Sequence, residues 1–206
     1  MQRKDHWDST YASKAINAVS WFQEHGELSL RLIQDSGVPL SASIIDVGGG
    51  ASTLVDDLLS RGYSALTVLD LSGTALSAAK ARLGGLADQV SWREADITSV
   101  QLPPHAFDVW HDRAVFHFLN SEDERRAYLA AAHGSVKPGG HVIVATFAED
   151  GPAKCSGLPV MRYSAKGLQS EFGPHFTLLH HEREEHHTPM GTVQPFIYCH
   201  FRKAIP

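Results

Sequence analysis

The chain has 206 residues, of which 43% are hydrophobic and 20% are charged, which is typical of one folded globular domain. The formal net charge is −5 and no Lys/Arg stripe is present, so no nucleic-acid partner is expected. No apolar run approaches the roughly 18 residues that a membrane span needs, so no membrane partner is expected either.

Apolar patterning predicts strands and helices that alternate along the chain as far as residue 147. The expected strands lie at 44–47, 65–69, 89–93, 107–110 and 141–147. The expected helices lie at 52–61, at 72–83 and from residue 121, where Ser121 and Glu124 form a capping-box pattern. The segment VKPGG is expected to end this last helix. Such alternation favours a parallel sheet with helices on both faces.

The pattern changes after residue 150. A long loop over 149–163 and a short helix over 164–172 precede two strands at 176–184 and 193–201. No helix separates these two strands, so they must pair antiparallel. The fold expected is therefore α/β, with a doubly wound seven-stranded sheet that is mostly parallel and ends in an antiparallel C-terminal hairpin.

A run of three glycines follows the first expected strand, in the segment IIDVGGGAST. A strand, a glycine-rich turn and a helix start together form a binding site for a polar or anionic ligand group. No Gly-Lys-Ser/Thr sequence is present, which excludes a Walker-type phosphate loop. Thr53 stands where the dinucleotide fingerprint needs its third glycine, so an NAD-dependent oxidoreductase is disfavoured.

Two acidic residues follow the next two strands. Asp70 ends the second strand, at the position where doubly wound folds place a carboxylate on ribose hydroxyls. The alternative is that Asp70 only caps the next helix, although Ser72 is the better N-cap residue there. Asp96 follows the third strand and precedes apolar Ile97.

With these residues in order, the sequence resembles the class I S-adenosylmethionine-dependent methyltransferases. The resemblance covers most of the chain from Ile44, including the segments FDVWHDRAVFHFL and VKPGGHVIVATF. It implies S-adenosylmethionine as the cofactor, with its methionine end at the glycine turn, its ribose at Asp70 and its adenine at Asp96 and Ile97. It also implies one domain over 1–206, with an N-terminal helical lid over 1–40 and a Rossmann-like core over 41–206.

The residues expected to bind the cofactor come from the strand ends and from the lid. They are Asp46, Gly48, Gly49, Gly50, Ser52, Asp70, Leu71, Asp96 and Ile97, together with Tyr11 and Trp21. Ser52 replaces a glycine that many family members carry, and its hydroxyl is expected to cap the helix or to reach the methionine carboxylate. Gly49 is a glycine that the family does not require. The lid aromatics could equally well be core residues of an amphipathic helix.

The acceptor side is expected at the end of the fourth strand, where His111, Asp112 and Arg113 are the catalytic candidates. The alternative is that Asp112 and Arg113 only form a local ion pair. His117 is expected to pack in the following apolar turn and not to act as a base.

The loop over 149–163 is a candidate wall of the acceptor site, since long loops in compact domains are often functional. In that loop, Cys155 and Arg162 could contact substrate, although Cys155 is more simply explained as a small buried apolar residue. The tract HHEREEHH, at 180–187, is expected to be a solvated strand end and turn. It is not expected to bind metal, since adjacent strand residues point to opposite faces.

The resemblance therefore implies an enzyme that transfers a methyl group from S-adenosylmethionine to a small molecule by in-line displacement. The alternatives are a protein-lysine methyltransferase and, less favoured, a non-catalytic module that only binds the cofactor. We expect a monomer or homodimer. The polar N-terminus and the two isolated cysteines, Cys155 and Cys199, indicate the cytoplasm.

Overall fold

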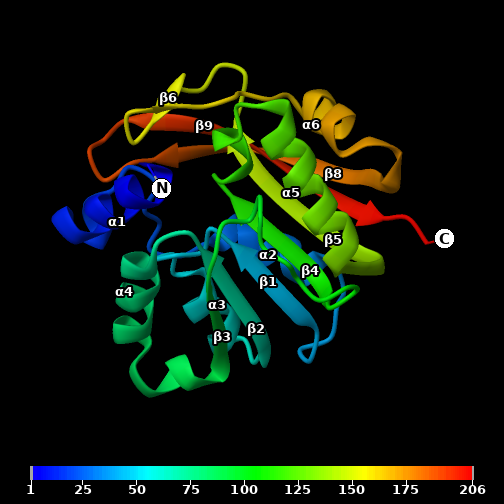
Figure 1. Cartoon of the computed structure of the whole chain (residues 1–206), viewed down its shortest axis with the longest axis horizontal. Coiled ribbons are helices and arrows are strands. Elements are labelled where there is room, and N and C mark those ends of the chain that lie inside the picture. Colours follow the sequence, from blue (N-terminus) through cyan, green and yellow to red (C-terminus); the bar gives the residue numbers. More distant parts are fainter. Residues whose placement is uncertain (1, 206) are drawn as a thin grey trace.

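The computed structural model describes residues 2–205, with side chains from residue 3, and centres on one seven-stranded sheet (Figure 1). The strand order is β3-β2-β1-β4-β5-β9-β8, and the first five strands are parallel. The last two are antiparallel, since β9 pairs with both β5 and β8 in that sense. The predicted fold is confirmed. The strands are β1 (Ser43–Val47), β2 (Ala65–Asp70), β3 (Val90–Glu94), β4 (Phe107–Arg113), β5 (Val136–Phe147), β8 (Phe176–His187) and β9 (Val193–Lys203).

Helices cover both faces of the sheet. Ile44 packs with residues of α2, α3 and α4, whereas its neighbour Ile45 packs with residues of α5 and α6. Because both faces of β1 are buried, apolar residues stand at consecutive positions in it, Ile44 and Ile45, and do not alternate with polar ones. The helices are α2 (Glu27–Asp35), α3 (Leu54–Ser60), α4 (Gly73–Leu83), α5 (Glu122–Ser135) and α6 (Ala165–Phe172).

Side-chain caps begin two of these helices as the sequence predicts. The Ser72 hydroxyl accepts a hydrogen bond from the Ala75 amide at the start of α4. At the start of α5, Ser121 and Glu124 form a reciprocal capping box. Each cap satisfies an amide that the first turn of a helix leaves unpaired.

Three element boundaries differ from the prediction. β4 continues through Arg113, so the polar residues after Trp110 are still in the strand. VKPGG ends α5 but is itself the start of β5, and a register shift near Phe107 accommodates it in the sheet. β8 continues through His187, so 180–187 is paired strand and not a solvated turn. Within it His186 is buried and donates to the Ser20 carbonyl at 2.8 Å.

The N-terminal region divides into two parts. α1 (Gln2–Ser13) lies beside α4 at the carboxyl edge of the sheet (Figure 1). α2, in contrast, buries Leu28, Leu32 and Ile33 in the core below the sheet. Only α1 and the segment that follows it therefore lie where a lid would lie, whereas residues 27–35 belong to the core layer.

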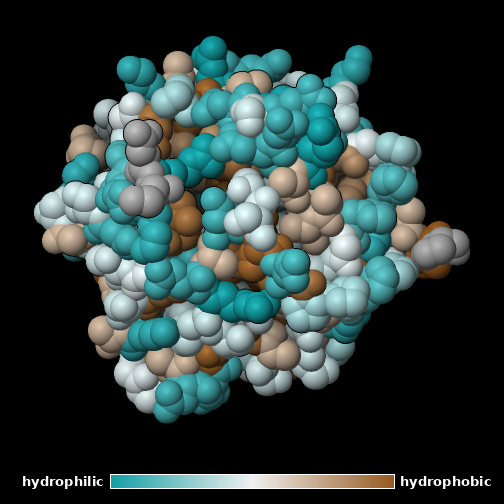
Figure 2. All heavy atoms as spheres, viewed as in Figure 1, coloured by the Kyte–Doolittle hydropathy of each residue, from teal (hydrophilic) through white to brown (hydrophobic). Residues whose placement is uncertain are grey.

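The surface gives little sign of a large apolar contact. In the space-filling view, polar residues dominate the visible face and the apolar patches are small and separated (Figure 2). Within residues 2–205, none of the helices is both long and apolar enough to cross a bilayer.

Candidate active site

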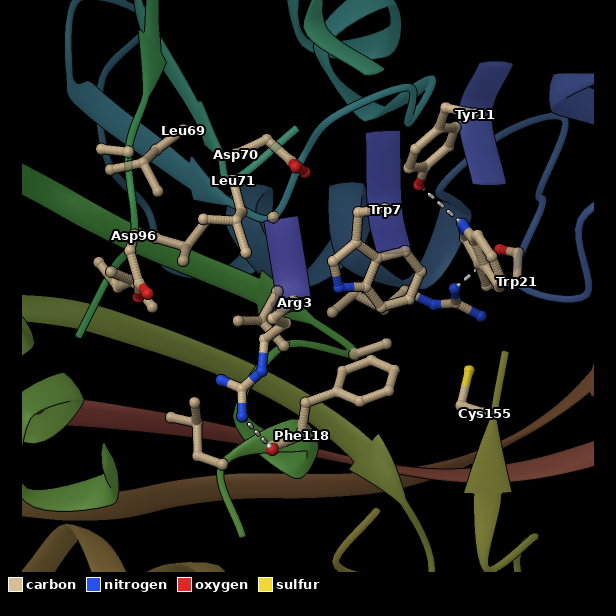
Figure 3. Close-up of a pocket in the computed structure, with 18 residues that line it drawn as sticks. Arg3, Trp7, Tyr11, Trp21, Leu69, Asp70, Leu71, Asp96, Phe118 and Cys155 are labelled. Carbon is tan, nitrogen blue, oxygen red and sulfur yellow. Dashed lines mark hydrogen bonds between the residues drawn. The ribbon is translucent and has the colours of Figure 1, made fainter. Parts of the chain in front are cut away.

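Two adjoining hollows lie at the carboxyl edge of the sheet. The large hollow lies between two sets of residues, which Figure 3 shows on opposite sides. The strand-end side is Leu69, Asp70, Leu71 and Asp96, and the aromatic side is Trp7, Tyr11, Trp21, Phe118 and Cys155. Ile97, which follows Asp96 in the chain, also lines the hollow and is counted with the strand-end side. The second, which we name the turn hollow, is lined among others by Ser29, Asp46, Gly49, Ser52 and His111. Tyr11, Trp21, Gly48 and Arg113 line both.

The three glycines of the turn are explained by what lies against them. A side chain at Gly48 would clash with Val115, and one at Gly49 would clash with the Asp46 carboxylate. Gly50 has a positive φ of 27° and lies against the carboxylate of Asp70, and it lines neither hollow. A glycine is therefore needed at position 49, because only a residue without a side chain allows the backbone to pass directly beside the carboxylate of Asp46.

Asp46 places an unpaired oxygen at the turn hollow. The residue is 4% exposed, and its Oδ1 lies 2.7 Å from Nδ1 of His111. Its Oδ2 is buried and has no hydrogen-bond partner among the described residues. A buried carboxylate oxygen without a donor is costly, so this position suits a ligand that brings N–H groups.

Asp70 is buried on the strand-end side of the large hollow, with 8% of its surface exposed. Its Oδ1 accepts a hydrogen bond from the Ser72 amide at 2.7 Å. Burial raises the pKa of Asp70 to about 7, and the nearby Asp46 and Asp8 carboxylates add to the effect. Asp70 is more than a cap, because Ser72 supplies the cap of α4 and the Asp70 carboxylate lines the hollow.

The far end of the strand-end side is apolar apart from one carboxylate. Leu71 and Ile97 form its apolar walls. Asp96 accepts hydrogen bonds through Oδ1 from both the amide and the hydroxyl of Thr98, at 2.9 and 2.7 Å. This turn fixes the carboxylate of Asp96 at the edge of a flat apolar space.

Ser52 lines the turn hollow and begins the helix that leaves it. Its hydroxyl accepts a hydrogen bond from the Leu54 amide at 3.2 Å. The Ser52 hydroxyl thus satisfies the first amide of α3, whereas the N-cap residue of that helix is Thr53, which makes no side-chain cap.

The expected role of Asp112 is wrong. This residue is fully buried and lines neither hollow among the described residues. Its carboxylate accepts hydrogen bonds from the Val115 and Phe116 amides and, at 2.6 Å, from the Tyr128 hydroxyl. Because β4 runs on to Arg113, alternate residues face opposite sides of the sheet, and Asp112 faces away from the hollows. It shapes the turn after β4.

Arg113 faces both hollows, and its ion pair is with Glu184 and not with Asp112. The guanidinium lies 4.3 Å from the centre of the Phe196 ring. It donates to the Tyr198 hydroxyl at 2.9 Å and to the Trp21 carbonyl at 3.1 Å. Arg113 therefore ties the segment that carries Trp21 to the C-terminal hairpin.

The aromatic side is formed mainly by the N-terminal region. Tyr11 and Trp21 meet in a hydrogen bond of 3.1 Å from the indole to the phenol oxygen. Trp7 packs edge-on against both Trp21 and Phe118, with ring centres 5.5 and 5.2 Å apart. Sequence reasoning assigned no role to Trp7 or Phe118. Trp7 stands one helical turn before Tyr11, which places the two rings on one face of α1.

Polar contacts hold α1 over the large hollow. Asp8 accepts from the Ser72 hydroxyl at 2.6 Å and from the Thr74 amide at 3.3 Å, at the start of α4. Lys4 bridges Asp8 and Glu94. These hydrogen bonds, from Lys4 first, hold the pKa of Asp8 well below its usual range. At the start of α1, Arg3 pairs with Glu124 at 2.7 Å, a contact that sequence reasoning also missed.

The loop over 149–163 supplies one side chain to the large hollow. Cys155 lines it, and burial raises the pKa of its thiol to about 12. Arg162 is exposed and donates to the Gly151 carbonyl, so it does not face the hollow. His117 is buried between Phe118 and Phe147, as expected, and burial lowers its pKa to about 3.

A strand-turn-helix with a buried acid, followed by acids after β2 and β3, is matched by one known family. The methyltransferase domain family matches residues 45–144, which include the glycine turn, Asp70, Asp96 and β4. The matched residues, 45–144, form a methyltransferase domain.

Two curated proteins are similar in sequence to this methyltransferase domain. An uncharacterized methyltransferase of Mycobacterium bovis is 34% identical over 114 residues, which is 55% of each chain. EEF1A lysine methyltransferase 2 of Mus musculus is 25% identical over 145 residues, covering 61% of this chain and 57% of the relative. The matches thus span little more than half the length of these relatives.

A solved structure shares the fold of this methyltransferase domain over nearly the whole chain. It is the 1,6-didemethyltoxoflavin-N1-methyltransferase of Burkholderia thailandensis, bound to 1,6-didemethyltoxoflavin and S-adenosylhomocysteine. The TM-score is 0.70 at 20% identity, and the match covers 98% of this chain and 84% of the other.

Proposed function

We propose that this protein transfers a methyl group from S-adenosylmethionine to a small molecule. The observation that carries the proposal is the division of the site. Three carboxylates at the strand ends, of which Asp46 and Asp70 are buried, lie opposite an aromatic wall under α1. The two hollows meet at Gly48, Tyr11, Trp21 and Arg113. Such a site suits a long ligand with several donors and an apolar reaction partner.

The residues fit the cofactor from end to end. The unpaired Oδ2 of Asp46 would accept from the ammonium of the methionine end, beside the backbone of Gly48 and Gly49. Asp70 would accept from the two ribose hydroxyls, since a carboxylate can take two donors at once. Asp96 would accept from the adenine amino group, with Leu71 and Ile97 against the ring.

The bound cofactor supplies an electrophilic methyl group on a sulfonium. Trp7, Tyr11 and Trp21 would exclude water from the reacting groups and present aromatic faces, which favour a cation. Arg113 would act by holding Trp21 in place through the carbonyl of that residue.

The aromatic side offers no evident general base in the part of the chain that the structure describes. Its titratable groups and their neighbours are Arg3, Tyr11, Arg113 and Cys155. Burial raises the pKa of Tyr11 and the pKa of Cys155, and a guanidinium group is a hydrogen-bond donor only, not a proton acceptor. The acceptor would therefore bring a nucleophile whose lone pair is free at neutral pH, and the site would supply alignment alone.

A small acceptor is favoured because α1 lies across the hollow and is fixed there by the contacts of Arg3 and Asp8. The similar fold of the toxoflavin-pathway methyltransferase, which holds a small heterocycle, supports this choice. The second candidate is a protein-lysine methyltransferase, which the likeness to EEF1A lysine methyltransferase 2 favours. A lysine side chain would need a channel past Trp7 and Phe118, which pack against one another. A cytoplasmic location, a monomeric or homodimeric state and a single domain over 1–206 remain predictions.

Methyl-labelled S-adenosylmethionine and a cell lysate test the proposal. After incubation, the label is measured separately in the protein fraction and in the low-mass fraction. We expect label in the low-mass fraction with the wild-type protein and, at the same cofactor concentration, much less with Asp70→Ala. Label confined to the protein fraction would favour a protein-lysine methyltransferase. Cofactor binding without label in either fraction would favour a non-catalytic binding module.

A further inference from the structure

Three polar side chains from separate elements, each almost completely buried, form a continuous series along the wall of the turn hollow. Ser29 comes from α2, His111 from β4 and Asp46 from β1, and they are 1%, 2% and 4% exposed. The Ser29 hydroxyl lies 2.8 Å from Nε2 of His111, and Nδ1 of His111 lies 2.7 Å from Oδ1 of Asp46. We propose that Ser29 and His111 are positioning residues that orient the Asp46 carboxylate toward the amino-acid end of the cofactor.

The direction of each hydrogen bond follows from the acceptor-only character of a carboxylate. With Asp46 ionised, Nδ1 of His111 must carry the proton that lies between them. In a neutral imidazole, Nε2 then accepts, and the Ser29 hydroxyl donates to it. The series therefore fixes one tautomer of His111, with its N–H on the side of Asp46.

This arrangement leaves Asp46 with one oxygen tied and one oxygen free. Asp46 and His111 are direct partners in the pairing of β1 with β4, so the sheet sets their separation. On the other side, the backbone at Gly49 lies so close to Oδ2 that no side chain fits there. The carboxylate is held between the imidazole and the turn: its unpaired oxygen, Oδ2, is buried against Gly49, and both Asp46 and Gly49 line the turn hollow.

The same three residue types form the nucleophilic triad of serine hydrolases, but their placement here is different. A nucleophilic serine must reach substrate, whereas Ser29 is almost completely buried on the inner face of α2. The member of the series with an unpaired oxygen at the hollow is Asp46. The series therefore ends on the acid, which is where we place the ligand.

The inference rests on the proposed function, because it assigns the amino-acid end of S-adenosylmethionine to Asp46. Two ligands separate this assignment from a general effect on folding. S-adenosylhomocysteine carries the ammonium, whereas 5′-methylthioadenosine has the same nucleoside and lacks the amino-acid end. Asp70 and Asp96 lie away from the series on the strand-end side, so they should bind both ligands alike.

Calorimetry with both ligands on three variants tests the series. We expect His111→Phe to weaken the binding of S-adenosylhomocysteine by about tenfold, which is the effect of one charge-assisted hydrogen bond. The same variant should change the affinity for 5′-methylthioadenosine by less than about twofold. Ser29→Ala should weaken the first ligand by about threefold, the effect of one neutral hydrogen bond. His111→Asn keeps an N–H donor toward Asp46 and should recover most of the affinity. Equal losses for both ligands, or no loss for either, would overturn the proposal.

A second measurement tests the series without the cofactor. Nitrogen-15 chemical shifts of His111 in the wild-type protein should show a protonated Nδ1 and an unprotonated Nε2. The opposite tautomer would overturn the proposal even if S-adenosylhomocysteine binds. If the expected tautomer is found and neither ligand binds the folded wild-type protein, the proposed function fails, and with it the orienting role of the series.

Discussion

The two sides of the large hollow are built in different ways. On the strand-end side, Asp70 is the last residue of β2 and Asp96 lies two residues beyond β3, and the parallel ladder fixes their places. On the aromatic side, Trp7, Trp21 and Phe118 come from separate segments that side-chain contacts bring together. The strand-end side is therefore determined locally, by a strand and the residue that ends it. The aromatic side depends on contacts between distant parts of the chain.

The largest expected effect is on the strand-end side. Asp70→Ala should weaken S-adenosylhomocysteine binding by at least tenfold, since two charge-assisted hydrogen bonds of about 1.5–3 kcal/mol each are lost. Calorimetry measures the affinity, and Asp123→Ala, an exposed acid on α5, is the matched control. Equal affinities of Asp70→Ala and wild type would remove the ribose assignment.

The pH dependence of binding tests the same carboxylate. Burial raises the pKa of Asp70 to about 7, and only the ionised form accepts both ribose hydroxyls. Affinity for S-adenosylhomocysteine should therefore rise about tenfold from pH 6 to pH 8, since the ionised fraction rises by that factor. Asp70→Asn should bind weakly, with little dependence on pH. A flat profile for the wild type would contradict this prediction.

The same pKa shift has a consequence for stability. The folded protein binds the Asp70 proton more tightly than the unfolded chain does, because its folded pKa lies above the ordinary aspartate value of 3.8. This group's contribution to the free energy of unfolding therefore falls as the pH rises from about 4 to about 7. In Asp70→Asn, the free energy of unfolding plotted against pH should lack this decrease between about pH 4 and pH 7.

A smaller effect is expected on the aromatic side, and on a different quantity. Trp7→Ala removes ring contacts of about 1 kcal/mol, and so should raise the KM for the acceptor about fivefold. Affinity for S-adenosylhomocysteine should change far less. Trp92→Ala is the control, because this ring lies outside both hollows. An equal loss of cofactor and acceptor binding would show that the two sides do not act separately.

The smallest expected effect concerns the contact between α1 and α4. Asp8→Ala removes an anion from the start of α4, a contact of about 0.3–1 kcal/mol, and should raise the acceptor KM about threefold. Proteolysis near Lys14 should become faster, since α1 would be held less firmly. Asp5→Ala, an exposed acid on the same helix, should behave like the wild type. If Asp8→Ala also matched the wild type, α1 would not depend on this contact.

The difference between the two sides also explains what the sequence could predict. The sheet, the glycine turn, Asp70 and Asp96 were predictable because each depends on a short apolar run and the residues at its end. The partners of Arg113 could not be predicted, because Glu184 and Tyr198 lie on β8 and β9 and come close to Arg113 only in the folded sheet. Trp7 carried a usable signal in its spacing from Tyr11.

The end of β4 shows how one boundary changes three roles. The strand was expected to stop at Trp110, which would leave His111, Asp112 and Arg113 together in a loop. Because the strand continues, His111 and Arg113 face the hollows, whereas Asp112 faces the opposite core. Ser29 could not be linked to His111 from the sequence, because α2 and β4 are far apart in the chain and come together only when the protein folds.

The central claim is that these hollows hold S-adenosylmethionine, and binding to the wild-type protein tests it most directly. Calorimetry with S-adenosylhomocysteine should give one site per chain, and a titration with NAD under the same conditions should give no binding. Binding of NAD, or a folded protein that gives no heat with S-adenosylhomocysteine, would contradict the account.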